Sequence, residues 1–168
     1  IAAEFSWAHD REMANGWPIE PSTAVQLMVG RAISGVELLA AHRLRSWGMT
    51  FVAELFGEHQ LDAIVTPTVG RTAPPLSDGA IASGESNTGL IMGMVKHIFL
   101  ANLLGLPAAS VPIGMGRASK LPVGLQLIGA WWEEAKLLRL ACALEDAHAG
   151  GAEERPPIFF HELDELLR

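Results

Sequence analysis

The side chains of this 168-residue sequence that could act as nucleophiles or metal ligands are few. The single cysteine, Cys142, lies beside the buried positions of a predicted helix, which indicates a small core residue and not a thiolate nucleophile. The six histidines show none of the ligand spacings of a zinc site. The sequence therefore predicts neither a metal centre nor cysteine chemistry.

Two amide side chains, Asn102 and Gln126, stand in otherwise apolar segments. A buried amide needs hydrogen-bond partners, so we predict that both satisfy nearby backbone groups in preference to contacting a substrate. The aromatic pair Trp131 and Trp132 follows a predicted strand, and we expect it to pack against the sheet.

Composition fits one globular domain and argues against several classes of protein. A net charge of -7 without a basic cluster is unsuited to binding a phosphate backbone, which argues against a nucleic-acid partner. A single cysteine cannot form an internal disulfide. No charged side chain occurs between Ile98 and Gly116, but Pro107 and Pro112 interrupt this segment, so we predict a buried core and not a membrane span.

The chain begins at Ile1, and its first residues lack the basic start and apolar run of a signal peptide. We therefore expect a piece of a longer protein. Its compartment is not determined by the sequence.

Hydrophobic periodicity predicts two helices in the first third of the chain. The first is expected over residues 22–32, after Pro21, with Ser22 or Thr23 as its N-cap. The second is long and amphipathic and is expected to end near Gly57. Its predicted buried face consists of Val36, Leu39, Ala40, Leu44, Trp47, Phe51 and Leu55.

Three short strands and a further helix are predicted in the middle of the chain. The strands are expected at 62–66, 108–113 and 123–128, where short apolar runs end at proline or glycine. A structured surface loop over 67–87 precedes a helix over 88–104 that stops at a glycine.

A last helix is predicted to open at Glu133 and Glu134, because acidic side chains complement the positive end of a helix, and to stop at the Gly150-Gly151 pair. Its predicted buried face is Leu137, Leu140, Ala141 and Leu144. The tail over 159–168 is expected to form a short docking helix.

Several short motifs follow one another between residues 62 and 129. They are Asp62-Ala-Ile-Val-Thr-Pro67, Asn102-Leu-Leu-Gly-Leu-Pro107-Ala, Val111-Pro-Ile-Gly114 and Leu121-Pro-Val-Gly-Leu-Gln-Leu-Ile-Gly129. In this order and spacing, they resemble the C-terminal part of amidase-signature hydrolases. Three further segments resemble plant-type fatty acid amide hydrolases: Thr66-Pro-Thr-Val-Gly-Arg-Thr-Ala-Pro74, Gly84-Glu-Ser-Asn87 and Pro156-Pro-Ile-Phe-Phe-His161.

This resemblance implies amide hydrolysis without metal or cofactor, by a nucleophilic serine served by a lysine and a serine in a cis peptide. A Gly-Ser-rich loop of the family supplies the N–H groups that bind the oxyanion. We find no such loop here: the lysines are Lys96, Lys120 and Lys136, and the Ser-Gly pairs begin at Ser34 and Ser83. We assign no catalytic residue and expect the triad upstream, so that the 168-residue chain alone is inactive.

The resemblance implies that this chain contributes scaffold and the wall of an acyl channel. The predicted substrate-binding residues share helical spacing on two helices: Val29, Ile33, Thr88, Ile91, Met92, Val95 and Phe99. The flexible methionine suits acyl chains of different shape. An apolar helix face is more often core than ligand wall, and that alternative remains open.

We predict an α/β fold in which residues 1–168 form the C-terminal part of a single amidase domain, an incomplete unit with a mixed central sheet flanked by helices. The intact protein is expected to hydrolyse fatty acid amides or N-acylethanolamines. The alternatives are a family enzyme for small amides, a glutamyl-tRNA amidotransferase A-type subunit, or a non-catalytic interaction module. We expect a hydrophobic small-molecule amide as partner. The location stays undetermined, intracellular or membrane-associated through peripheral contact, and a homodimer also stays open.

Overall fold

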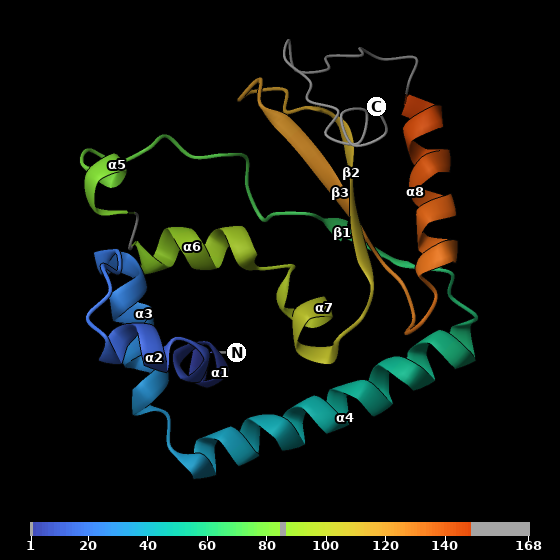
Figure 1. The fold of residues 1–168 in the computed structure, drawn as a ribbon. Helices are drawn as coiled ribbons and strands as arrows, with labels where there is room; N and C mark the ends of the chain where they lie inside the picture. The colour runs from blue at the N-terminus through green and yellow to red at the C-terminus, as the bar shows by residue number, and fades with distance from the viewer. Residues whose placement is uncertain (1, 85–86, 149–168) are drawn as a thin grey trace, which may run out of the picture.

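The described residues are 2–84 and 87–148, seen in a computed structural model (Figure 1). The expected helix stop at 150–151, the tail helix and the motif beginning at Pro156 lie outside them. The elements follow along the chain in this order: α1 (Ala2–Ala8), α2 (Asp10–Ala14), α3 (Pro21–Ala32), α4 (Gly35–His59), β1 (Ile64–Pro67), α5 (Ala80–Ser83), α6 (Thr88–Val95), α7 (Phe99–Leu104), β2 (Ala108–Met115), β3 (Pro122–Ile128) and α8 (Glu134–His148).

The three predicted strands form one sheet in the order β1-β3-β2, with both pairings antiparallel. Successive side chains of a strand point to opposite faces, so Leu127 and Ile128 of β3 pack on opposite sides of the sheet. Leu127 packs with Val111 of β2 and Leu137 of α8. Fully buried Ile128 packs with residues of α4 and α7 on the other face (Figure 1). The α/β class with flanking helices is confirmed.

The predicted buried face of α4 is wrong. Val36 is 77% exposed, whereas Val52 is only 2% exposed and packs in the core. Gly48 lies on the buried side, because a Cβ there would meet Leu104 of α7 at 3.0 Å. The helix carries apolar residues on more than one side, and periodicity alone could not choose the side that meets α7 and the sheet.

The misassigned residues form an exposed α4 stripe, which we define as Val36, Leu39, Leu44, Trp47 and Phe51. The rings of Trp47 and Phe51 stack on the helix surface, with centroids 5.6 Å apart and an interplanar angle of 15°. Contiguous exposed apolar surface of this kind marks an interaction site or an aggregation liability.

The predicted start of the first helix also needs correction. Neither Ser22 nor Thr23 caps α3; the N-cap is Glu20, without a side-chain bond, and Pro21 occupies the first turn. A proline is favoured there because its missing N–H has no helical partner. The second helix, α4, ends at His59, two residues beyond Gly57 and close to the predicted end.

The start of α4 is a capping box. The hydroxyl of Ser34 accepts a hydrogen bond from the backbone N–H of Glu37 at 3.2 Å, and the Glu37 carboxylate accepts one from the backbone N–H of Ser34 at 2.8 Å. Hydrogen bonds from the Ser34 hydroxyl and backbone lower the pKa of Glu37 below its usual value. The cap fixes where the chain turns, since α3 and α4 meet at 93°.

The helix predicted over 88–104 is broken into α6 and α7 at residues 96–98. The carbonyl oxygen of Met94 accepts a hydrogen bond from the backbone N–H of Gly70 at 3.2 Å. A Cβ on Gly70 would overlap the carbonyl oxygen of Gly93, so the loop lies directly against the end of α6. This hydrogen bond satisfies a carbonyl at the end of α6 that would otherwise bond within a continuous helix, which accounts for the break.

Two predictions on the last third of the chain are partly wrong. In α8 the expected apolar residues face the sheet, but Cys142 is exposed, because the residue after Ala141 points about 100° away around the helix. Trp131 packs against the core as expected, whereas Trp132 is exposed and has a positive φ of 67°. Among the described residues, no single helix is long and apolar enough to cross a bilayer; α3 and α4 qualify only as a bent pair.

The buried side of α4 can be tested with two matched substitutions, Val52→Ala and Val36→Ala. Both substitutions remove the same two methyl groups from one helix, so the difference between their effects on the free energy of unfolding reports the effect of burial. We expect Val52→Ala to lower the free energy of unfolding by about 2 kcal/mol, and Val36→Ala to change it by less than about 0.5 kcal/mol. Urea unfolding followed by circular dichroism measures both, and equal effects would contradict the assigned core.

The exposed α4 stripe predicts that the 168-residue chain binds a hydrophobic dye. The double variant Leu39→Glu/Phe51→Glu should lose much of the dye fluorescence, because two charged side chains interrupt the apolar surface. Arg43→Glu is the control, since Arg43 is an exposed neighbour outside the stripe. A dye-silent, cooperatively unfolding monomer would show that the stripe is covered.

Candidate functional site

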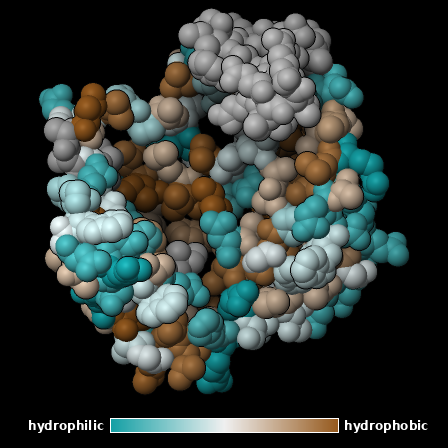
Figure 2. Space-filling view, viewed as in Figure 1, coloured by the Kyte–Doolittle hydropathy of each residue, from teal (hydrophilic) through white to brown (hydrophobic). Residues whose placement is uncertain are grey.

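An apolar cavity of about 620 Å³ lies between α1, α3, α6 and α7. Figure 2 shows the corresponding hollow as a concentration of hydrophobic residues over the region where Figure 1 draws α6. The lining residues come from four helices and the turn before α7: Ala2, Phe5, Ser22, Val25, Gln26, Val29, Thr88, Ile91, Met92, Val95, Ile98, Phe99 and Asn102. Its volume is within the range of small-molecule sites.

The structure brings together all but one of the residues predicted to bind substrate. Those that line the apolar cavity are Val29, Thr88, Ile91, Met92, Val95 and Phe99. Ile33 does not line it. The backbone of Ile33 is extended (φ −70°, ψ 122°) just after the end of α3, so its spacing from Val29 no longer places both side chains on one face.

Sequence reasoning missed several lining residues, and one group of them carried a signal. Ser22, Val25 and Gln26 precede Val29 by seven, four and three positions, which is the spacing of a single helix face. The contribution of α1 through Phe5 carried no such signal, because only tertiary packing brings that helix to the cavity.

The contact between α1 and α3 is close and specific. A Cβ on Gly30 would overlap the carbonyl oxygen of Ala2 and come within 2.8 Å of the Ser6 Cβ. Ser6 is buried, and its hydroxyl donates a hydrogen bond to the carbonyl oxygen of Leu27 at 2.8 Å. Glycine at position 30 therefore permits the approach that closes one side of the apolar cavity.

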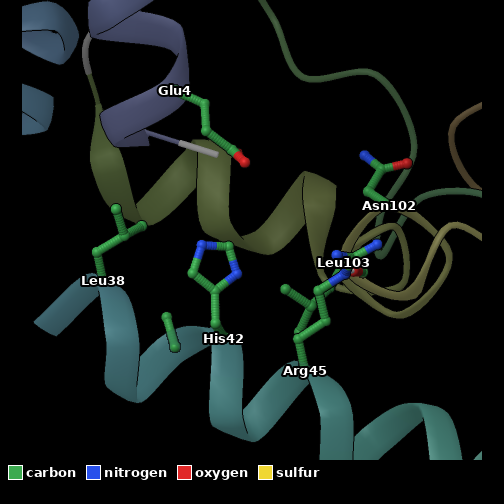
Figure 3. A pocket seen from close by; sticks show the side chains of 7 residues that line it. Glu4, Leu38, His42, Arg45, Asn102 and Leu103 are labelled. Carbon is green, nitrogen blue, oxygen red and sulfur yellow. Dashed lines mark hydrogen bonds between the residues drawn. The ribbon is translucent and has the colours of Figure 1, made fainter.

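A second, smaller cavity of about 190 Å³, the polar cavity, lies between α1, α4 and α7. Figure 3 shows Glu4 of α1 and the side chains of His42 and Arg45 of α4 around the same space, with Asn102 across from them. Asn102 lines both cavities, so they adjoin at this residue.

Two side chains hold the C-terminal end of α7 in place. Arg45 Nε donates a hydrogen bond to the carbonyl oxygen of Leu103 at 2.7 Å. Trp131 Nε1 donates a hydrogen bond to the carbonyl oxygen of Leu104 at 3.0 Å. Both satisfy carbonyls left open by the helix end, where Gly105 has a φ of 70°. They thereby position the Phe99 wall of the apolar cavity.

The predictions for the two amides have different outcomes. Asn102 is exposed at the cavities and is not the buried residue that we expected. Gln126 is buried at 6% exposure, but its partner is a side chain: the hydroxyl of Thr66 donates to Gln126 Oε1 at 3.2 Å. The cross-strand register that places these two opposite each other could not be derived from the sequence.

The lysines of the chain do not form an enclosed basic site. Lys136 forms ion pairs with Asp62 at 3.8 Å and Glu133 at 3.4 Å, and Lys96 and Lys120 are exposed. Across residues 2–84 and 87–148, no three metal-ligating side chains gather at a site. The largest described feature of this region is therefore the apolar cavity, at about 620 Å³ against about 190 Å³ for the polar one.

The arrangement is that of an α/β chain with a helix-lined apolar cavity, and comparisons give its relatives. The family model described as Amidase matches residues 18–138. A fatty acid amide hydrolase of Medicago truncatula is 36% identical over 92% of this chain and 25% of the relative, and one of Arabidopsis thaliana is 37% identical over 84% and 23%. A crystal structure of an amidase superposes with a TM-score of 0.66 and 26% identity, covering 88% of this chain and 33% of that one.

This chain belongs to the amidase family. It spans about a quarter of the length of the curated relatives that it matches. Both the family and the likeness to plant fatty acid amide hydrolases agree with the resemblance inferred from the motifs.

The cavity can be tested by narrowing it with Val29→Trp in the full-length protein. Val29 lines the cavity and is 58% exposed, so the larger ring can be accommodated without disrupting the core. Displacing about two methylenes of a ligand should weaken binding of a long-chain fluorescent acyl amide by roughly tenfold, since each buried methylene contributes about 0.8 kcal/mol.

Val36→Trp is the matched control, because this valine lies on α4 outside the cavity. Fluorescence titration measures both variants. Equal affinities for Val29→Trp and the unmodified protein would rule out this cavity as the acyl site.

Proposed function

We propose that the protein containing this chain is an amidase that hydrolyses fatty acid amides, with N-acylethanolamines as its substrate class. The observation that carries the proposal is the apolar cavity, around which α3, α6 and α7 gather the residues expected to contact an acyl chain. Likeness to plant fatty acid amide hydrolases supports the same substrate class.

The role of this chain is to bind and orient the acyl part of the substrate. Apolar side chains such as Ile91 and Val95 remove hydrocarbon surface from water, which contributes about 25 cal/mol per Å² buried. Met92 can adopt several rotamers and so adapts to chains of different shape. Holding the chain in one place restricts the position of the amide at its end, which favours attack by a fixed nucleophile.

The chemical step belongs to groups outside this chain. The proposal places the nucleophilic serine, its cis-peptide serine and the lysine upstream, as the resemblance to amidase-signature enzymes implies. A neutral lysine would relay the proton from the nucleophile to the leaving amine, and backbone N–H groups would stabilise the oxyanion. No metal or organic cofactor takes part in this scheme.

Turnover by the full-length protein on amides of increasing chain length tests the proposal. We expect kcat/KM to rise with each added methylene up to the length that fills the cavity, by up to about fourfold per methylene. A preference for acetamide or another short amide would overturn the fatty acid assignment in favour of a small-amide enzyme. Glutaminase activity that requires a tRNA-dependent partner would favour an amidotransferase subunit.

The purified 168-residue chain is the control for the location of the triad. It should give no turnover of any N-acyl amide while still binding a long-chain acyl probe. Measurable hydrolysis by this chain would show that its own residues are sufficient for catalysis.

A further inference from the structure

A group of uncharged polar side chains crosses the sheet on the face opposite α8. We call it the hydroxyl patch and define it as Thr66 and Thr68, Ser110 of β2 and Gln126 of β3. In the register of the sheet, Gln126 stands between Thr66 and Ser110. The Thr68 and Ser110 hydroxyls are 2.6 Å apart, and the Thr66 hydroxyl donates to Gln126 Oε1 at 3.2 Å.

A glycine keeps the hydroxyl pair together. A Cβ on Gly124 would lie 2.7 Å from Thr68 Oγ1 and 2.8 Å from Ser110 Oγ, closer than side-chain atoms approach. Gly124 also accepts a hydrogen bond from the backbone N–H of Thr68 at 2.9 Å. The absence of a side chain here is therefore required for the geometry of the pair.

The Ser110 side of the hydroxyl patch lies on the part of this sheet face that the core leaves uncovered. Ile128, one alternation from Gln126 on β3, is buried beneath α4 and α7, but Ser110 is exposed. Gln126 itself is buried at 6% exposure. A buried carboxamide beside reachable hydroxyls is a prearranged hydrogen-bonding surface, because burial restricts its orientation.

The hydroxyl patch adjoins the apolar cavity through the segment that follows β1. Thr68 is bonded to Gly124 of the sheet, and Gly70, two residues on, donates to Met94 of α6 at 3.2 Å. Two residues span at most about 7 Å. Val95, the next residue of α6, lines the cavity, so a short run of backbone connects the hydroxyl patch to the apolar wall.

We infer that the hydroxyl patch binds the uncharged alcohol of the substrate's head group while the acyl chain lies in the apolar cavity. A hydroxyl both donates and accepts, so the Thr68–Ser110 pair can bond a third hydroxyl without adding charge. None of the four side chains is ionisable at neutral pH, which suits an alkanolamide and not an anionic group. This inference rests on the proposed function, and it assigns a binding site to the head group of the substrate, which the apolar cavity does not accommodate.

The test compares two amides in the full-length enzyme that differ only in the head: an N-ethanolamide and the N-propylamide of the same acid, which replaces the hydroxyl with a methyl. Ser110→Ala and Thr68→Val should each lower kcat/KM for the ethanolamide about threefold to tenfold, the range for one uncharged hydrogen bond, and leave the propylamide unchanged. Gly124→Ala should reproduce this loss, because its Cβ separates the two hydroxyls.

Gly129→Ala is the matched control, since Gly129 directly follows β3 and its Cβ would meet Leu137 and Pro107 only at 3.4 and 3.5 Å. A parallel loss for both amides, with a lowered melting temperature, would show that the hydroxyl patch is structural and overturn the inference. Unchanged kinetics for the ethanolamide would overturn it as well.

The test separates failure of this inference from failure of the proposed function. It uses whichever acyl length the enzyme turns over best, so a preference for short chains would contradict the fatty acid assignment and still leave the head-group ratio measurable. A loss of ethanolamide selectivity in Ser110→Ala with an intact chain-length series supports both.

Discussion

The packing of α7 between α4 and the sheet is the contact on which the rest of the structure depends. Val52 and Phe56 of α4 meet Leu104 of α7 and Ile128 of β3 in one buried cluster. Because Arg45 and Trp131 also bond the last carbonyls of α7, this helix cannot shift without breaking hydrogen bonds. Phe99 and Asn102 of α7 line the apolar cavity, so the contacts that hold α7 also hold this side of the cavity.

Two surfaces of opposite character are connected through the backbone near the end of α6. On one side the apolar cavity offers hydrocarbon contacts, and on the other the sheet presents hydroxyls and a carboxamide without charge. The backbone bonds of Thr68 and Gly70 join them. An amphiphilic amide matches this combination, because its chain gains from leaving water while its head keeps hydrogen-bonding partners.

Local patterns predicted the elements better than their contacts. Strand positions, the start of α8 and the face of α6 that lines the cavity followed from periodicity and from proline and glycine signals. The buried side of α4 did not, because apolar residues on several sides make its faces equivalent until a partner packs. The prediction of one continuous helix over 88–104 was also wrong, because the backbone N–H of Gly70, distant in sequence, donates a hydrogen bond to a carbonyl of α6.

By itself the sequence determined the family and the apolar helix faces that line the cavity, because short motifs and side-chain spacing are local properties. Only the tertiary structure decided that α1 closes the cavity, that Ile33 turns away from it, and that the α4 stripe stays exposed in this chain. It also brought together the hydroxyls of Thr68 and Ser110, forty-two residues apart. Contacts between distant segments depend on strand register and helix packing, and neither is encoded in any single stretch of residues.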